Sequence, residues 1–200
     1  MESCGGTHYW ARFAKQQGHE VKVIAARHVK PFRQRQKTDA TDAMAIAVAA
    51  RQSHVQASRL LSIEEQSQQS IVRARELLIK QKVKTSNHMR ALLLEFGIPI
   101  AKGDKALQKA IPEVLEDGEN SLTGNFRMML DTIYQHFQAL LERVEVISKQ
   151  LDCVVNQDNV CKQLQALEGV GPISAIQLKI VLGQTGHYVK GREAAACIGL

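Results

Sequence analysis

Two aspartates with helical spacing are the first residues in this sequence that could support metal-dependent chemistry. Asp39 and Asp42 lie at the start of an alanine-rich segment, residues 40–50, whose composition predicts a helix. Side chains three residues apart lie on one face of a helix, so both carboxylates would point the same way. Two carboxylates on one face can share a hard divalent cation such as Mg²⁺, which prefers oxygen ligands. Asp39 and Asp42 are therefore candidate metal ligands.

The same pair also has a purely structural interpretation. Asp39 is a favourable N-cap residue, Asp42 then falls at the third helical position as in a capping box, and acidic side chains suit the positive end of a helix. The loop before the pair carries a run of positive charge at Lys30, Arg33, Arg35 and Lys37. The spacing alone leaves a metal site and a helix cap as alternatives.

Glu2 is the third acidic candidate, and its place follows from the elements around it. An amphipathic helix is predicted to end near Gly18, and the alternating residues 20–25 predict a strand. Helix, strand, basic loop and helix form half of an α/β sheet domain. In such domains a turn and a helix follow a strand, so Glu2 would lie at the carboxyl end of a strand, where open sheets place their active sites. A flexible, solvated terminus is the alternative.

A long basic helix is predicted over residues 63–96, from a capping box formed by Ser62 and Glu65 to a stop at Gly97. The positive residues in its middle are Arg73, Arg75, Lys80, Lys82, Lys84 and Arg90. A solvated helix face usually mixes charges of both signs, so this one-sided run indicates contact with phosphates. No aromatic residues interleave it, which argues against base stacking on a single-strand platform.

A heptad pattern follows a segment, residues 102–118, that predicts a short helix and a loop interrupted at Pro112. The apolar residues that recur in alternating steps of four and three are Phe126, Leu130, Ile133, Phe137, Leu140, Val144, Ile147, Leu151 and Val154. About four heptads of this kind predict a coiled coil. Its partner could be the basic helix of the same chain, another subunit, or both.

Two further helices are predicted to meet at a glycine-rich turn, residues 169–172. Gly169 and Gly171 permit the tight turn, and Pro172 suits the first turn of the second helix. Backbone N–H groups at such a helix start can hold a DNA phosphate without reading bases. The two glycines are therefore candidate nucleic-acid contacts, and an ordinary turn in a helical bundle is the alternative.

The composition of the whole chain narrows the class of protein. It has 200 residues, a net charge of +6 and only 4% aromatic residues, which favours a helical protein with a polyanionic partner. The four cysteines are scattered without metal-ligand spacing, so they are expected to be free thiols in a reducing cytoplasm. No signal peptide and no long apolar run is present, so neither secretion nor a membrane span is expected.

Three segments, in this order, resemble the IS-one-ten family of insertion-sequence transposases, also called DEDD transposases or bridge-RNA-guided recombinases. They are MESCGGTHYWAR at the start, VKPFRQRQKTDATDA at residues 29–43, and LEGVGPISAIQLKIVLG at residues 167–183. The resemblance implies a mixed but mainly α fold. Its expected parts are a partial RuvC-like (RNase H) α/β domain over residues 1–53, a helical coiled-coil region over 54–156, and a truncated C-terminal transposase domain with a helix-hairpin-helix over 157–200.

The resemblance also implies a chemistry and a set of partners. Glu2, Asp39 and Asp42 correspond to three of the four acids that bind metal in this family, and Mg²⁺ is the expected cofactor. In the family the metal polarises the phosphodiester while a serine of the C-terminal domain attacks it. DNA and a structured guide RNA are the expected partners, with oligomerisation of the protein through the coiled coil.

The sequence departs from the family pattern at two points. The family's first acid would precede Met1, and its catalytic serine would follow Leu200; Ser174 is not that residue. We therefore expect a truncated, inactive form and no recombination by this chain alone. The alternatives are a non-catalytic nucleic-acid-binding coiled-coil fragment, a structural oligomerisation module whose charge is incidental, and a remnant that does not fold because half a sheet leaves its strand edges uncovered.

Overall fold

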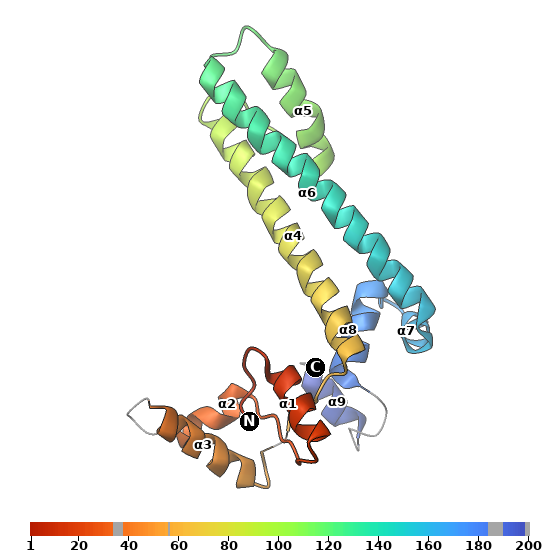
Figure 1. Cartoon of the computed structure of the whole chain (residues 1–200). Helices are drawn as coiled ribbons and strands as arrows, with labels where there is room; N and C mark the ends of the chain where they lie inside the picture. The colour runs from red at the N-terminus through yellow and green to blue at the C-terminus, as the bar shows by residue number, and fades with distance from the viewer. Residues whose placement is uncertain (34–37, 56, 184–189, 199–200) are drawn as a thin grey trace. The chain divides into compact units, whose positions relative to one another are not determined.

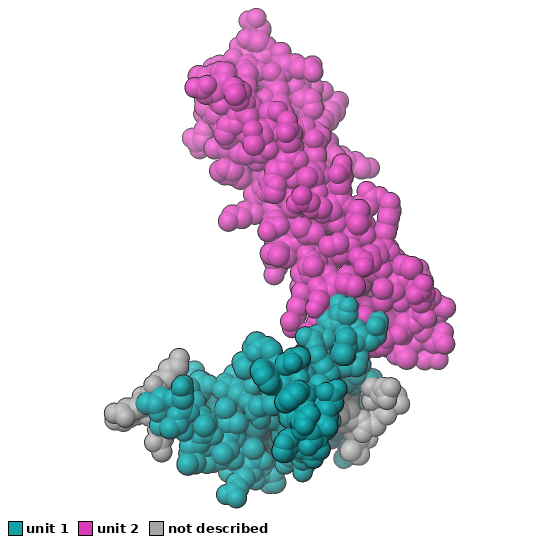
Figure 2. All heavy atoms as spheres, in the orientation of Figure 1, with its two compact units in different colours: residues 1–67, 182–196 teal, residues 68–181, 197–200 magenta. Residues whose placement is uncertain are grey.

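The computed structural model describes residues 1–33, 38–55, 57–183 and 190–198, and it is mainly helical (Figure 1). The mainly α class expected from the sequence is thereby confirmed. The chain divides into two compact units (Figure 2). Unit 1 comprises residues 1–67 and 182–196, and unit 2 comprises residues 68–181 and 197–200.

The N-terminal part of unit 1 consists of α1 (Thr7–Gln16), α2 (Ala26–Val29), the 3₁₀ helix η1 (Lys30–Phe32) and α3 (Asp39–Arg51). Gly18, just past the end of α1, has a φ of 84°, as expected of a glycine that ends a helix. Ala45 and Ala49 lie four residues apart on one face of α3 and are buried in one cluster with Ile24 and Val29. These small side chains let α3 pack closely on the segment before it.

The strand predicted over residues 20–25 is reduced to two isolated bridges. Ile24 pairs in parallel with Glu2, and Val23 pairs antiparallel with Ser58. The Ser3 N–H donates to the Ile24 carbonyl at 2.7 Å. A strand needs a partner along its whole length to satisfy its N–H and C=O groups, and each partner here supplies only one or two residues. The prediction of a full strand was therefore wrong in extent, although the pairing lies where it was expected.

Unit 2 is built on a hairpin of two long helices, α4 (Ile63–Leu94) and α6 (Gly124–Gln157), with α5 (Asp104–Glu116) packed near the end where they join (Figure 1). The predicted capping box at the start of α4 is confirmed. The Glu65 N–H donates to Ser62 Oγ at 3.0 Å, and the Ser62 N–H donates to Glu65 Oε2 at 2.9 Å.

The apolar seam of α6 faces inward within the same chain. None of its nine predicted residues is exposed; four are buried and the others are half-buried. Leu130 and Phe137 share a buried cluster with Met89 of α4 and with Leu107 and Ile111 of α5. The basic helix of this chain is therefore a partner of the seam, and α5 is a second partner that the sequence did not indicate.

Pro112 lies inside α5 and does not interrupt it, which corrects the expectation for residues 102–118. Proline has no N–H to donate to the carbonyl four residues earlier, which is that of Gln108. The hydroxyl of Tyr134 on α6 donates to this carbonyl at 3.0 Å. A tertiary hydrogen bond thus satisfies the acceptor that the helix leaves unpaired, and the helix continues.

The last described elements are α7 (Asn159–Gln165), α8 (Pro172–Leu182) and α9 (Gly191–Ile198). The predicted turn between two helices is present, with α8 starting at Pro172. Throughout the described part of the chain, no helix combines the length and the apolarity needed to cross a membrane.

Candidate functional site

Glu2 is held in place by backbone pairing. It bridges to Ile24, and the Met1 ammonium group donates to the Lys22 carbonyl at 2.7 Å. A turn through Gly6, whose φ is 80°, then leads into α1. The Glu2 side chain is only 16% exposed. Its carboxylate therefore has a defined position at the end of the first short paired segment.

Asp39 and Asp42 begin α3, but neither takes the capping role that the sequence allowed. The N-cap is Thr38, and its capping-box partner is Thr41. The Thr41 N–H donates to Thr38 Oγ1 at 3.2 Å, and the Thr38 N–H donates to Thr41 Oγ1 at 3.0 Å. The interpretation of the two aspartates as cap and third helical residue was wrong, because threonines one position earlier satisfy those groups.

Arg33 connects two of the three candidate acids. Its Nη2 donates to both carboxylate oxygens of Glu2 at 2.8 Å, and its Nε lies 3.5 Å from Asp42 Oδ1. Residues at the start of the chain and on α3 are thereby brought to one cation. In the sequence, Arg33 stands out only as one charge of a basic loop, and no spacing rule identifies such a bridge. Arg35 and Lys37 of that loop lie outside the described residues.

The position of the acids meets the needs of Mg²⁺ in part. Among the described residues no three His, Cys, Asp or Glu side chains lie close enough to hold a metal ion. Mg²⁺, however, usually keeps several waters and is held by one or two carboxylates together with substrate phosphates. Glu2 and Asp42 already share a guanidinium cation, so their donor atoms fit such a site. Asp39 stands on the same helix face but is not part of the bridge.

Three of the six basic residues predicted to contact nucleic acid hold unit 2 together. Arg75 Nε donates to Ser148 Oγ on α6 at 2.8 Å, and Lys82 forms an ion pair with Asp104 at the start of α5. Arg90 donates to two backbone carbonyls of the loop before α5. All three side chains are half-buried. We call them the anchor residues, because each ties α4 to another part of the hairpin.

The other three basic residues form a positive line on the surface of α4. Arg73, Lys80 and Lys84 are exposed, and their spacings of seven and four place them on one side of the helix. Within the described residues, none of these three side chains has a hydrogen bond or an ion pair. At 1.5 Å per residue they span about 16 Å. We call this set the basic stripe; Leu77, 55% exposed, lies between its first two members.

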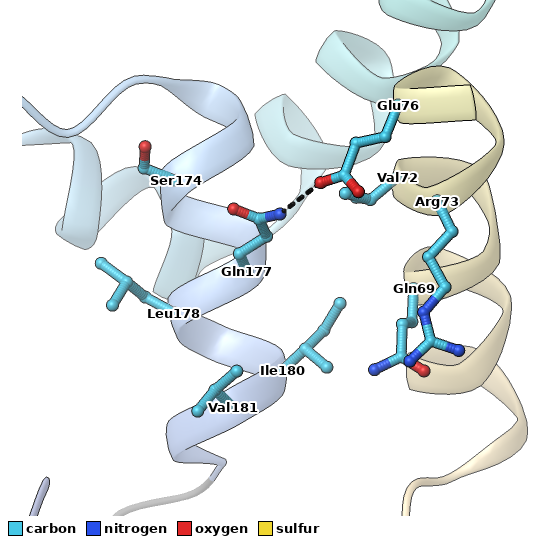
Figure 3. A pocket seen from close by; sticks show the side chains of 9 residues that line it. All are labelled: Gln69, Val72, Arg73, Glu76, Ser174, Gln177, Leu178, Ile180 and Val181. Atoms are coloured by element: carbon cyan, nitrogen blue, oxygen red, sulfur yellow. Dashed lines mark hydrogen bonds between the residues drawn. The ribbon is translucent and has the colours of Figure 1, made fainter. Parts of the chain in front are cut away.

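A cleft of about 540 Å³ lies between α4 and α8 (Figure 3). All the residues that line it belong to unit 2. Its apolar side chains include Val72 and Ile180, and Arg73 of the basic stripe stands on its α4 side. Gln177 Nε2 of α8 donates to Glu76 Oε1 of α4 at 3.1 Å. The sequence could not indicate this cleft, because its two walls come from segments about a hundred residues apart.

The glycine turn before α8 is open. Gly169 has a φ of 82°, and a side chain at Gly169 or Gly171 would meet nothing within 4 Å. The Val170 N–H donates to the Leu167 carbonyl at 3.1 Å, and the Ala175 N–H donates to the Gly171 carbonyl at 2.9 Å. Gly169 and Gly171 themselves are exposed, so a ligand can approach the backbone of the turn.

An ion pair fixes the start of α7 against α8. Asp158 accepts a hydrogen bond from the Cys161 N–H and an ion pair from Lys179. Burial raises the pKa of Asp158, but the bonds from Lys179 and Cys161 outweigh it and hold the pKa below its usual value. Burial and then the Asp158 charge raise the pKa of the Cys161 thiol to about 11, which makes it unreactive at neutral pH. The described cysteine side chains, Cys4, Cys153 and Cys161, are free thiols.

Comparison with known proteins shows what the chain is similar to. Residues 1–98 match the model of the DEDD family of IS110 type, described as transposase. The chain is 33% identical over 202 residues to the transposase for insertion sequence element IS1328 of Yersinia enterocolitica, covering 100% of this chain and 59% of that protein. A probable family 20 transposase of Pseudomonas aeruginosa is 34% identical over 201 residues, with coverage of 100% and 60%. The transposase for element IS1111A of Coxiella burnetii is 30% identical over 203 residues, with coverage of 100% and 55%. The chain thus spans at most about three fifths of the length of these relatives.

Proposed function

Because the chain belongs to the DEDD (IS110) family of insertion-sequence transposases, we propose that it acts in DNA transposition. Acids of unit 1 bind a divalent cation, and unit 2 holds nucleic acid by its phosphates. The observation that carries this proposal is the meeting of Glu2 and Asp42 at one cationic group, Arg33. Two carboxylates that already share a cation are suited to share a metal ion.

The proposed cofactor is Mg²⁺, with Glu2 and Asp42 as ligands and Asp39 joining them from the same face of α3. When bound, the metal would polarise a phosphodiester and stabilise the charge that develops on its oxygens. The residues of the chain orient it: backbone pairing fixes Glu2, and the threonine capping box fixes the start of α3.

Unit 1 is proposed to be part of a RuvC-like (RNase H) domain. The parallel bridge between Glu2 and Ile24, with α1 connecting the two paired segments, supports this proposal. Parallel pairs need a crossover connection, usually a helix, and open sheets carry their active sites where strands end. Glu2 lies at the end of the first paired segment, just before the turn that leads into α1.

Unit 2 is proposed to be a coiled-coil arm, followed by a helix-hairpin-helix around Gly169 and Gly171. The basic stripe would contact the phosphates of DNA or of a structured guide RNA, and the open turn would hold a further phosphate. The arm would also serve the assembly of a homo-oligomer in the cytoplasm. Measuring the molar mass in solution by light scattering tests the proposed oligomerisation; a strictly monomeric protein would exclude it.

A second candidate function is a non-catalytic nucleic-acid-binding module of the same family. The absence of a three-ligand group among the described residues favours it, as does the guanidinium that already occupies the carboxylate oxygens of Glu2 and contacts Asp42. The two candidates differ in one assay. The purified chain is incubated with labelled DNA from the ends of the element, with and without Mg²⁺ and the transcribed RNA of the element.

Binding is measured by fluorescence anisotropy. Cutting or joining of the DNA is detected as new products on a denaturing gel. Mg²⁺-dependent cutting or joining that Asp42→Asn abolishes would establish catalysis by this chain. Salt-sensitive binding without new products would establish the binding module. Neither binding nor products would reject both and leave a structural oligomerisation module.

A further inference from the structure

We propose that Arg33 is the resident counter-cation of Glu2 and Asp42 and that a divalent cation binds this pair by displacing it. The inference rests on the proposed function, because it takes these two carboxylates as the metal site. It adds to that site a basic residue, Arg33, which the positions of the acidic residues do not predict. Arg33 would keep the site assembled when no metal is bound and would set how tightly a metal binds.

The geometry makes the two cations competitors for the same oxygens. The guanidinium contacts both oxygens of Glu2 through one nitrogen at 2.8 Å, so a metal at Glu2 must share or replace these contacts. The contact to Asp42 Oδ1 is longer, at 3.5 Å. A hard divalent ion binds carboxylate oxygens directly and carries twice the charge of the guanidinium. It therefore balances both carboxylates, whereas Arg33 leaves one negative charge uncompensated.

The Arg33 guanidinium is also held loosely enough to move away from the two carboxylates. Its side chain is 35% exposed, and the contacts of its guanidinium within the described residues are those to Glu2 and Asp42. Its backbone is tied separately, because the Arg33 N–H donates to the Lys30 carbonyl at 3.2 Å at the end of η1. The guanidinium can therefore swing out without disturbing the 3₁₀ helix. Ion pairs that are partly exposed to solvent are weak, which favours exchange.

A structural role for the bridge makes the opposite prediction for metal affinity. If Arg33 only held Glu2 near α3, its removal would disorder the site and weaken metal binding. If it is a displaceable counter-cation, its removal frees the oxygens and strengthens metal binding, while the metal-free protein loses stability. The sign of the change in affinity therefore decides between the two.

The test is calorimetric titration of the purified chain with Mn²⁺, used as a substitute for Mg²⁺, at low ionic strength. The variant is Arg33→Gln, and the matched control is Arg27→Gln, which removes the same charge from an exposed arginine on α2. We expect Arg33→Gln to bind Mn²⁺ about fivefold tighter or more, in the range of ordinary coupling between sites. Arg27→Gln should bind as the parent does, and Asp42→Asn should not bind.

Thermal unfolding gives a second readout that does not depend on activity. Without metal, Arg33→Gln should melt at a lower temperature than the parent, and Mn²⁺ should raise its Tm by more than it raises that of the parent. If Arg33→Gln does not fold, Arg33→Lys replaces it. Its compact ammonium cannot reproduce the forked contacts of a guanidinium, so it too should bind Mn²⁺ more tightly than the parent.

Each outcome has a distinct meaning. Tighter binding in Arg33→Gln or Arg33→Lys supports the inference and the metal site together. Equal or weaker binding, with Asp42→Asn inactive in binding, overturns the role of Arg33 and leaves the metal site standing. No Mn²⁺ binding by any form overturns both.

Discussion

The division of the six basic residues of α4 into two groups can be tested with a matched pair of triple variants. The stripe variant is Arg73→Gln, Lys80→Gln and Lys84→Gln. The anchor variant is Arg75→Gln, Lys82→Gln and Arg90→Gln. Both remove three positive charges from the same helix. An effect of net charge alone would therefore be the same in both variants, and only the position of the charges distinguishes them.

The expected magnitude follows from the geometry. The basic stripe spans about 16 Å, and a nucleic-acid strand presents a phosphate every 3.4 Å or so along a duplex axis, so all three side chains can reach phosphates. Each phosphate contact contributes about 0.7 to 0.9 to the slope of log affinity against log salt. The stripe variant should therefore show a slope shallower by about 2 to 3. Between 50 and 200 mM salt, parent binding should fall about 20- to 40-fold more than binding by this variant.

The anchor variant should behave in the opposite way. Its slope should match that of the parent, because the anchor residues already bond to other parts of unit 2. Its free energy of unfolding should fall by about 3–4 kcal/mol, the sum expected for three hydrogen bonds of about 1 kcal/mol each and a partly exposed ion pair. Urea denaturation and fluorescence anisotropy with duplex DNA and with structured RNA provide the two measurements. Equal salt slopes in the two variants would refute the assignment of the stripe.

Two further predictions concern contacts that hold unit 2 together. Tyr134→Phe should lower the free energy of unfolding by about 1 kcal/mol, and by less when Pro112 is replaced by alanine, whose N–H can donate to the Gln108 carbonyl instead. A double-mutant cycle in urea measures this, and equal losses in both backgrounds would contradict it. Because the pKa of Asp158 is held low in the folded protein, its contribution to stability is full above the ordinary carboxyl pKa of about 3.9 and is lost as the pH falls through the folded value. Asp158→Asn should remove that part of the acid sensitivity seen in urea midpoints, and an unchanged pH profile would contradict it.

Much of the helical framework could be predicted from local pattern. The ends of α1 and α4 follow from glycines and from the Ser62–Glu65 capping box, whose groups lie within three residues of each other. The seam of α6 follows from its heptads. Local signals of this kind act over one or two turns of a helix, so they survive in a single sequence.

The sequence also pointed to Glu2, Asp39 and Asp42 and to a family of DNA-processing proteins. It misjudged features that depend on what comes close in space. The strand at residues 20–25 found too little partner backbone, and Pro112 is tolerated because a tyrosine of another helix replaces its missing donor.

Tertiary structure alone decided which charges are available for function. The pattern of α4 shows six similar cations, but Arg75, Lys82 and Arg90 meet partners supplied by α6, α5 and the loop before α5. The side chains of the basic stripe meet no such partner in the part of the chain that the structure describes. The meeting of Glu2 with Asp42 at Arg33 is likewise invisible in their spacing. Whether a charged side chain serves the fold or faces a ligand depends on residues distant in the chain, and only folding brings them together.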